Sequence, residues 1–88
     1  MYYIITRPFV IGTMYRLLDD TNGNVWRSHK LSAILDDTAV WGTTPHKTPG
    51  DVIAASMQTN RCTYEEHTVY GPVEHISDFI DKYPELFL

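Results

Sequence analysis

The chain has 88 residues, of which 43% are hydrophobic and 20% are charged, and its formal net charge is −4. This length allows one hydrophobic core but not two, and the composition is that of a folded rather than a disordered protein. No apolar run approaches the roughly 20 residues that a membrane helix needs, and the N-terminus lacks a signal-peptide pattern. We therefore expect a single compact domain over residues 1–88, located in the cytoplasm.

Charge is unevenly distributed along the chain. Residues 1–61 hold six basic and five acidic residues, whereas residues 62–88 hold one basic and six acidic residues. This acidic segment disfavours nonspecific DNA binding, which depends on clustered Lys and Arg. It suits contact with a basic protein surface, although a solvated face that keeps the protein soluble would have the same composition.

The first predicted element is a β-strand over residues 2–6. Its residues are β-branched and aromatic with little alternation, which is typical of a strand that is covered on both faces. Pro8 should end the strand or place it at a sheet edge, because proline lacks the backbone N–H that a central strand needs.

Residues 13–28 predict a β-hairpin, because two β-prone segments flank Asp20-Thr-Asn-Gly23 and Asn-Gly tolerates positive φ. A two-residue loop would place Leu18 opposite Arg27, and a three-residue loop would place it opposite Trp26. We expect the three-residue loop, because it pairs two apolar side chains.

Residues 29–37 are ambiguous, since their apolar positions fit both helical and strand spacing. We favour a short helix with Ser28 as its N-cap. Residues 41–50 contain two Pro, two Gly and three Thr, a composition that predicts a long surface loop.

The next helix is predicted to begin at Thr48, with Pro49 in the first helical position and Asp51 completing a capping box. Asn60 is expected to close it. Its core face is expected at Val52, Ile53 and Met57.

Residues 63–70 predict a half-exposed strand that stops at Gly71-Pro72. A last helix follows, because apolar residues recur at i, i+3, i+4 and i+7, and Pro84 ends it. Those apolar positions are Ile76, Phe79, Ile80 and Tyr83. The fold class expected from all these elements is α+β, a small antiparallel sheet built on an N-terminal hairpin and packed against two or three short helices.

No residue pattern predicts an enzyme, a metal site or a cofactor. The four histidines and the single cysteine, Cys62, show no metal-ligand spacing. Cys62 and His67 are the right types for a nucleophile and its base, but residues five apart on a strand point to opposite faces. We therefore expect a protein that acts by binding.

The leading hypothesis is a small acidic binding protein that acts by protein–protein interaction. It would be a stoichiometric inhibitor or adaptor of the kind that phages and mobile elements encode. A basic partner of unknown identity would contact the acidic side chains of the last third of the chain. These are Glu65, Glu66, Glu74, Asp78, Asp81 and Glu85.

The alternative hypothesis is a protein that binds or sequesters a nucleotide-like anionic ligand. Basic residues interleave with aromatic ones in the first half of the chain, as charge and stacking contacts require. The residues proposed for this role are Trp26, Arg27, Trp41, Lys47 and Thr48. For these side chains we favour a structural interpretation, in which Trp26 lies in the core and Arg7, Arg16 and Arg27 lie on a solvated sheet face. With two Trp and six Tyr, the chain also leaves a homodimer open.

Overall fold

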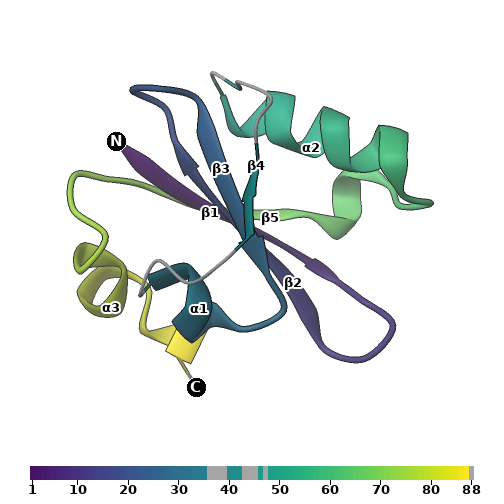
Figure 1. Ribbon diagram of the computed structural model, residues 1–88. Helices are drawn as coiled ribbons and strands as arrows, with labels where there is room; N and C mark the ends of the chain where they lie inside the picture. Colours follow the sequence, from purple (N-terminus) through teal and green to yellow (C-terminus); the bar gives the residue numbers. More distant parts are fainter. Residues whose placement is uncertain (36–39, 43–45, 47, 88) are drawn as a thin grey trace.

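The computed structural model of the chain describes residues 1–35, 40–42, 46 and 48–87. Within these residues, five strands form one antiparallel sheet in the order β4-β3-β2-β1-β5 (Figure 1). The strands are β1 (Tyr2–Pro8), β2 (Thr13–Asp19), β3 (Asn24–Ser28), β4 (Val40–Gly42) and β5 (Thr68–Val73). The helices are α1 (Leu31–Leu35), α2 (Pro49–Thr59) and α3 (Asp78–Lys82), with the 3-10 helices η1 (Tyr64–Glu66) and η2 (Pro84–Phe87). The predicted α+β class is confirmed.

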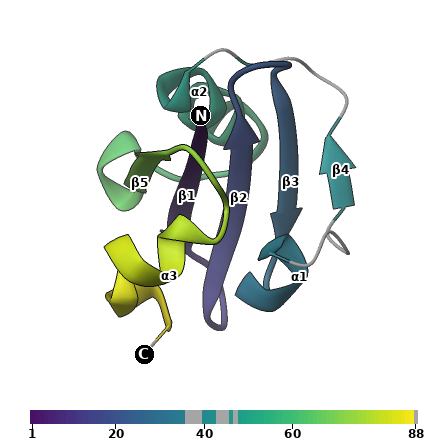
Figure 2. The same cartoon turned by 90° about the vertical axis from the view of Figure 1, so that its left-hand side faces the viewer.

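Helices cover both faces of the sheet (Figure 2). On one face, α1 and α3 contribute Ile34 and Phe79 to a cluster of buried side chains. On the other face, α2 contributes Ile53 to a second cluster. The adjacent residues Ile4 and Ile5 of β1 belong to different clusters, because successive side chains of a strand point to opposite faces. The first strand is therefore covered on both sides, as its sequence predicts.

The hairpin between β2 and β3 forms, but its predicted register is wrong. Leu18 lies opposite Val25 and Leu17 lies opposite Trp26, so the loop has four residues, Asp20 to Gly23. The three-residue loop would have set Leu17 opposite Arg27. The observed register instead pairs apolar side chains on both faces of the sheet, which explains why it is preferred.

The hairpin loop is held by local hydrogen bonds. Gly23 has φ of 78° and its N–H donates to the carbonyl of Asp19 at 2.9 Å. The side chains of Asp19 and Asn22 accept from the N–H groups two residues ahead, at 3.1 and 2.9 Å. The predicted positive φ at Gly23 is confirmed.

Residues 31–35 form the predicted short helix, which starts later than residue 29. Ser28 ends β3, and its Oγ accepts from the N–H of Lys30 at 3.1 Å, so the serine orders the turn that leads to the helix. The predicted surface loop over residues 41–50 is wrong at Trp41 and Gly42. These residues pair with β3 as the edge strand β4, because pairing satisfies backbone groups that a loop would leave to water. Residues 36–39, 43–45 and 47 lie outside the described residues.

Helix α2 begins as its sequence predicts. Thr48 Oγ1 accepts from the N–H of Asp51, the carboxylate of Asp51 accepts from the N–H of Thr48, and Asn60 is the C-cap. The predicted core position of Met57 is wrong, since its side chain is 39% exposed and Ser56 is buried instead. Ser56 and Met57 each lie one helical turn after a buried residue of α2. Helical periodicity alone could therefore not show which of the two side chains is buried.

Strand β5 differs from its prediction at both ends. Residues 64–66 form η1, and β5 continues through Gly71-Pro72 to Val73. Pro72 is tolerated because β5 is an edge strand, where a missing N–H breaks no ladder. The N–H of Gly71 donates to the hydroxyl of Tyr83 at 3.1 Å, so the C-terminal segment covers this edge.

Helix α3 is shorter than predicted and buries only one of its side chains. Phe79 is fully buried, as expected, whereas Ile80 is 55% exposed and its predicted core position is wrong. A helix of five residues can direct only one narrow face to the core. Pro84 follows the helix and begins η2. None of the helices in the described residues is long and apolar enough to cross a membrane.

Candidate functional site

The six acidic residues predicted to bind a partner do not lie on one surface. Glu65 and Glu66 belong to η1, which packs against α2, and the other four lie around α3 and η2. Figure 1 shows η1 beneath α2 at one end of the molecule and α3 at the opposite end. The acidic side chains therefore form two separate groups.

The group around α3 forms a small acidic patch. Glu74, Asp78 and Asp81 line a shallow hollow together with Met1 and Lys82. Asp78 is only partly exposed, and its carboxylate accepts from the N–H of His75 at 3.1 Å. We refer to Glu74, Asp78 and Asp81 as the acidic patch.

The residues predicted to bind a nucleotide-like ligand are not brought together. Trp26 packs against the cluster beneath α1 and α3, whereas Arg27, the next residue of β3, points to the other face. Thr48 caps α2. The backbone of Trp41 pairs with Trp26, but Lys47 and the side chain of Trp41 lie outside the described parts.

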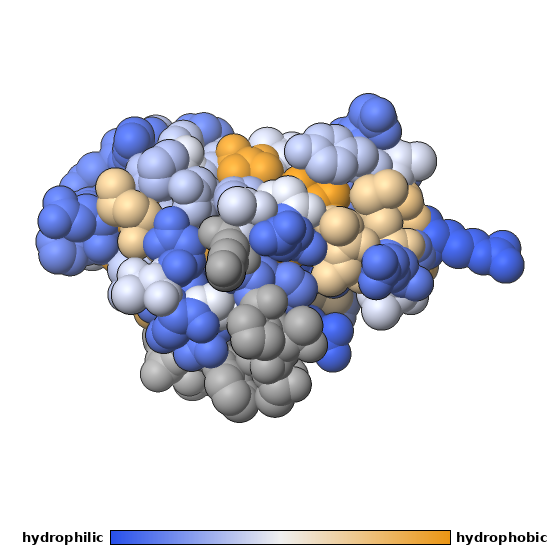
Figure 3. Space-filling view, turned by 90° about the horizontal axis from the view of Figure 1, so that it is seen from above, coloured by the Kyte–Doolittle hydropathy of each residue, from blue (hydrophilic) through white to orange (hydrophobic). Residues whose placement is uncertain are grey.

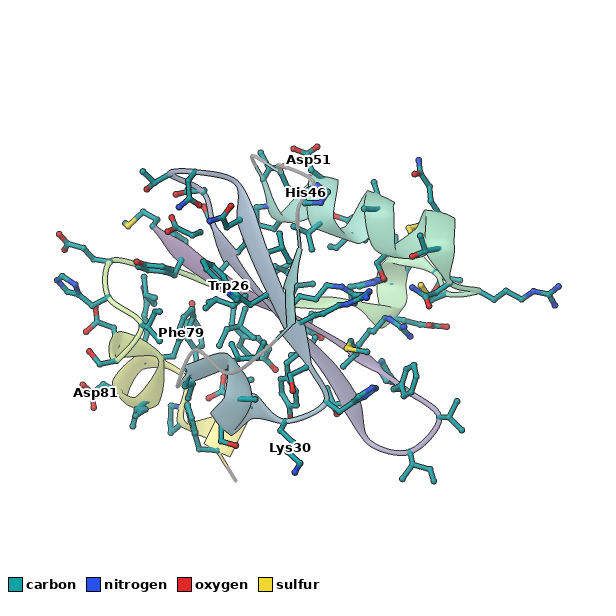
Figure 4. All side chains as sticks on the ribbon, in the orientation of Figure 1. Trp26, Lys30, His46, Asp51, Phe79 and Asp81 are labelled. Atoms are coloured by element: carbon teal, nitrogen blue, oxygen red, sulfur yellow. The ribbon has the colours of Figure 1, made fainter. Side chains whose placement is uncertain are left out.

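Three arginines instead form a row across the α2 face of the sheet. Arg16 of β2 lies opposite Ile5 of β1 and opposite Arg27 of β3, and Arg7 lies two residues beyond Ile5. Because side chains alternate along a strand, all three arginines share the face of Ile5, which packs against α2. Figure 4 shows side chains that end in nitrogen between α2 and the sheet. Like charges opposite one another destabilise a sheet, so this row is an unfavourable arrangement by itself.

Two of these arginines are buried, although solvent exposure was the sequence expectation. Arg7 and Arg16 are each 7% exposed, and Arg27 lies at the exposed margin. Arg7 Nη1 donates to the carbonyl of Pro8 at 3.2 Å, and its guanidinium carbon lies 5.3 Å from the centre of the Phe9 ring. Arg7 Nε and Arg16 Nη1 are buried without a hydrogen-bond partner. We refer to Arg7 and Arg16 as the arginine pair.

No carboxylate of the described residues forms an ion pair with the arginine pair. The pKa of Arg16 is lowered by burial first, and then by the positive charges of Arg7 and Arg27. A guanidinium nevertheless stays protonated in proteins, because its ordinary pKa is above 12. The arginine pair is therefore a buried positive charge that the described carboxylates do not compensate.

A second polar cluster adjoins Arg16 at the end of α2. His67 Nδ1 lies 2.9 Å from the carbonyl of Thr63, which can only accept, so Nδ1 donates this hydrogen bond. His67 Nε2 lies 3.1 Å from the hydroxyl oxygen of Ser56, within hydrogen-bond distance. Cys62 Sγ lies 3.8 Å from Ser56 Oγ, and Cys62 acts to raise the pKa of Arg16 against the larger effect of burial. Ser56 therefore links Cys62 to His67, a contact that their sequence spacing did not predict.

This second cluster has limited chemical access. Ser56 is 2% exposed, so a substrate could reach its hydroxyl only if α2 moved. Among the described residues, no group of three or more His, Cys, Asp or Glu side chains could hold a metal ion. On the α2 face of the sheet, the charged side chains that a ligand could bind are therefore Arg7, Arg16 and Arg27.

Comparisons with known proteins give no relative. No protein-family model, no curated protein and no solved structure matches the chain.

Figure 3 shows the molecule from above, with a mostly hydrophilic surface on which hydrophobic residues form small, separate patches. Broad hydrophobic contact is therefore not favoured on that side.

Proposed function

We propose that the protein binds an anionic ligand and that Arg7 and Arg16 hold its charged group. One observation carries the proposal: both side chains are more than nine-tenths buried, yet each has a buried N–H group without a partner, and no carboxylate of the described residues pairs with either. A buried polar group without a hydrogen bond costs about 1–3 kcal/mol, and more if it is charged. An anion that accepted these hydrogen bonds would offset that cost. Both N–H groups are buried, so the anion reaches them only when the side chains or elements that cover them move.

We propose binding without catalysis. A nucleophile must reach its substrate and have a base within hydrogen-bond distance. Ser56 has such a base in His67 but is buried, and Cys62 contacts Ser56 rather than His67. The arginine pair can orient and neutralise an anion, which is sufficient for a receptor or sequestering protein. This function keeps the anionic-ligand alternative of the sequence analysis but assigns it to other residues.

Thermal unfolding in phosphate and in chloride at equal ionic strength tests this function. A ligand that binds only the folded state raises the melting temperature by mass action. We expect phosphate to raise the melting temperature of the wild type more than that of Arg16→Met. Lys30→Met removes an exposed cation elsewhere and should retain the full response. Equal responses of all three proteins would mean that phosphate acts only through its general salting effect, and the proposed function would be wrong.

A second candidate function is contact between the acidic patch and a basic protein. It is supported by the gathering of Glu74, Asp78 and Asp81 around one hollow. Glu74→Lys with Asp81→Lys reverses two exposed charges and leaves the hydrogen bond of Asp78 intact. A partner captured from a lysate should associate more slowly with this variant at low salt, because surface charges steer association. Equal association rates for the two proteins would exclude the acidic patch.

A further inference from the structure

We infer that the group bound between Arg7 and Arg16 is a phosphate monoester in its dianionic form. The inference rests on the proposed function and specifies its ligand class. The arginine pair places two positive charges in one buried region, with Arg27 opposite Arg16 at the exposed margin. A monoanion would leave one of the two buried charges uncompensated, whereas a dianion neutralises both. Uncompensated buried charge is the costly state, so the balance of charge favours the dianion.

The buried N–H groups without a partner belong to two different side chains. A carboxylate is best bound by the two parallel N–H groups of one guanidinium. Here the unpartnered buried atoms are Nε of Arg7 and one Nη of Arg16, which belong to different guanidinium groups. Arg7 also uses Nη1 for the carbonyl of Pro8. One anion that satisfied both would have to present oxygens to two guanidinium groups, as a phosphate with its several oxygens can.

The gradient of burial along the arginine row indicates a terminal phosphate. Arg7 and Arg16 are buried, and Arg27 is exposed beside Arg16. The charged group can thus be enclosed while the rest of the ligand stays at the surface near Arg27. A phosphodiester carries a single negative charge and has a substituent on two sides, so it meets neither condition. The predicted class is a molecule that ends in a phosphate monoester.

Calorimetric titration of the full chain with small probes tests this class. Methyl phosphate supplies the dianion, dimethyl phosphate supplies the diester, and acetate supplies a planar monoanion. At a pH where methyl phosphate is doubly ionised, we expect it to bind at least tenfold more tightly than either of the others. Equal affinities for all three would overturn the phosphate monoester and leave the proposed anion binding in place. Absence of binding by all three would overturn both.

A measurement on the wild type makes the assignment independent of variant folding, and titration of variants complements it. In ¹H–¹⁵N spectra of the wild type, methyl phosphate should shift the Arg7 Nε–H resonance, and an unchanged resonance would contradict the site. In titrations, Arg16→Met should lose the preference for methyl phosphate, whereas Lys30→Met should keep it.

Adenosine 5′-monophosphate and O-phosphoserine then distinguish two sources of the same phosphate group. Tighter binding of either than of methyl phosphate would support a ligand that continues past Arg27, and weaker binding of both would contradict that extension.

Discussion

Arg16 carries a positive charge on the α2 face of the sheet, where its neighbours are Arg7, Arg27 and the buried end of α2. Lys and Arg are rarely buried unless they are paired, because the loss of water around the charge is costly. At most positions of a core strand, an apolar side chain would stabilise the fold more. The retention of a charge here is the reason for assigning Arg16 a binding role.

Replacement of Arg16 by Met should stabilise the protein by about 1–3 kcal/mol, because Met fills most of the same space without a charge or unpaired N–H groups. Urea denaturation measures this change as a higher midpoint. Arg61→Met is the control, because Arg61 is exposed and its replacement should change stability by less than about 0.5 kcal/mol. A lower midpoint for Arg16→Met than for wild type would show that Arg16 has a stabilising partner.

The gain from Arg16→Met should not depend on pH near neutrality. The pKa of Arg16 is lower in the folded than in the unfolded protein. For a base with this sign of shift, the destabilisation is fully present while both states are protonated. It is relieved only as pH rises through the lowered folded pKa toward the unfolded value. Unfolding midpoints measured between about pH 6 and 8 should therefore differ from those of wild type by a constant amount.

The role of the arginine pair could be anticipated only in part from the sequence. The spacing of Arg7 from Ile5, and of Arg16 from Leu18, places both arginines on one face of their strands, which alternation alone predicts. That face of the sheet is covered by α2, which lies more than thirty residues further along the chain. No local pattern reports that covering, so a solvated face was the reasonable expectation for these side chains.

At the scale of elements, local signals predicted the start of α2 and failed at the limits of β5. The cap of α2 involves side chains within three residues of one another, so its sequence contains the whole interaction. Strand β5 passes through Gly71-Pro72 because it lies at the sheet edge and Tyr83 covers it. Edge position is a property of the complete sheet, and residues 63–73 alone do not encode it.

The β2–β3 loop permits a direct test of backbone conformation. Gly23 has φ of 78°, a region that β-branched residues strongly disfavour, so Gly23→Val should destabilise the protein by about 1 kcal/mol or more. Thr21→Val introduces the same side chain at an exposed loop position and serves as the matched control. Chemical denaturation of both variants gives the comparison. Equal midpoints for the two variants would mean that the loop adapts without strain.

At the scale of the whole molecule, one sheet separates two clusters whose surroundings differ in polarity. The face beneath α1 and α3 buries a hydrophobic cluster and the uncharged Thr6. The α2 face combines the second cluster with the arginine pair and with buried Ser56. The fold class was predictable because it follows from the number and type of elements. The difference in polarity between the two faces was not predictable, because it depends on which helix packs on which side of the sheet.

This division predicts that stability and ligand binding can be changed separately. Phe79 is fully buried in the cluster that joins β1, β2, α1 and β5. Phe79→Ala should cost about 3–5 kcal/mol, a large part of the 5–15 kcal/mol typical of a folded domain. Ile80→Ala changes the neighbouring side chain, which is 55% exposed, and should cost less than about 1 kcal/mol. Urea denaturation provides both values.

Phosphate titration of Phe79→Ala and Arg16→Met completes the test. Phe79 lies on the face opposite the arginine pair, so whatever fraction of Phe79→Ala remains folded should bind phosphate with the affinity of wild type. Arg16→Met should show the reverse behaviour, with higher stability and weaker binding. If Phe79→Ala instead lost affinity while it was still folded, the two faces would be coupled through β1 and β2. Similar losses of stability in Phe79→Ala and Ile80→Ala would show that α3 packs on the sheet through a different face.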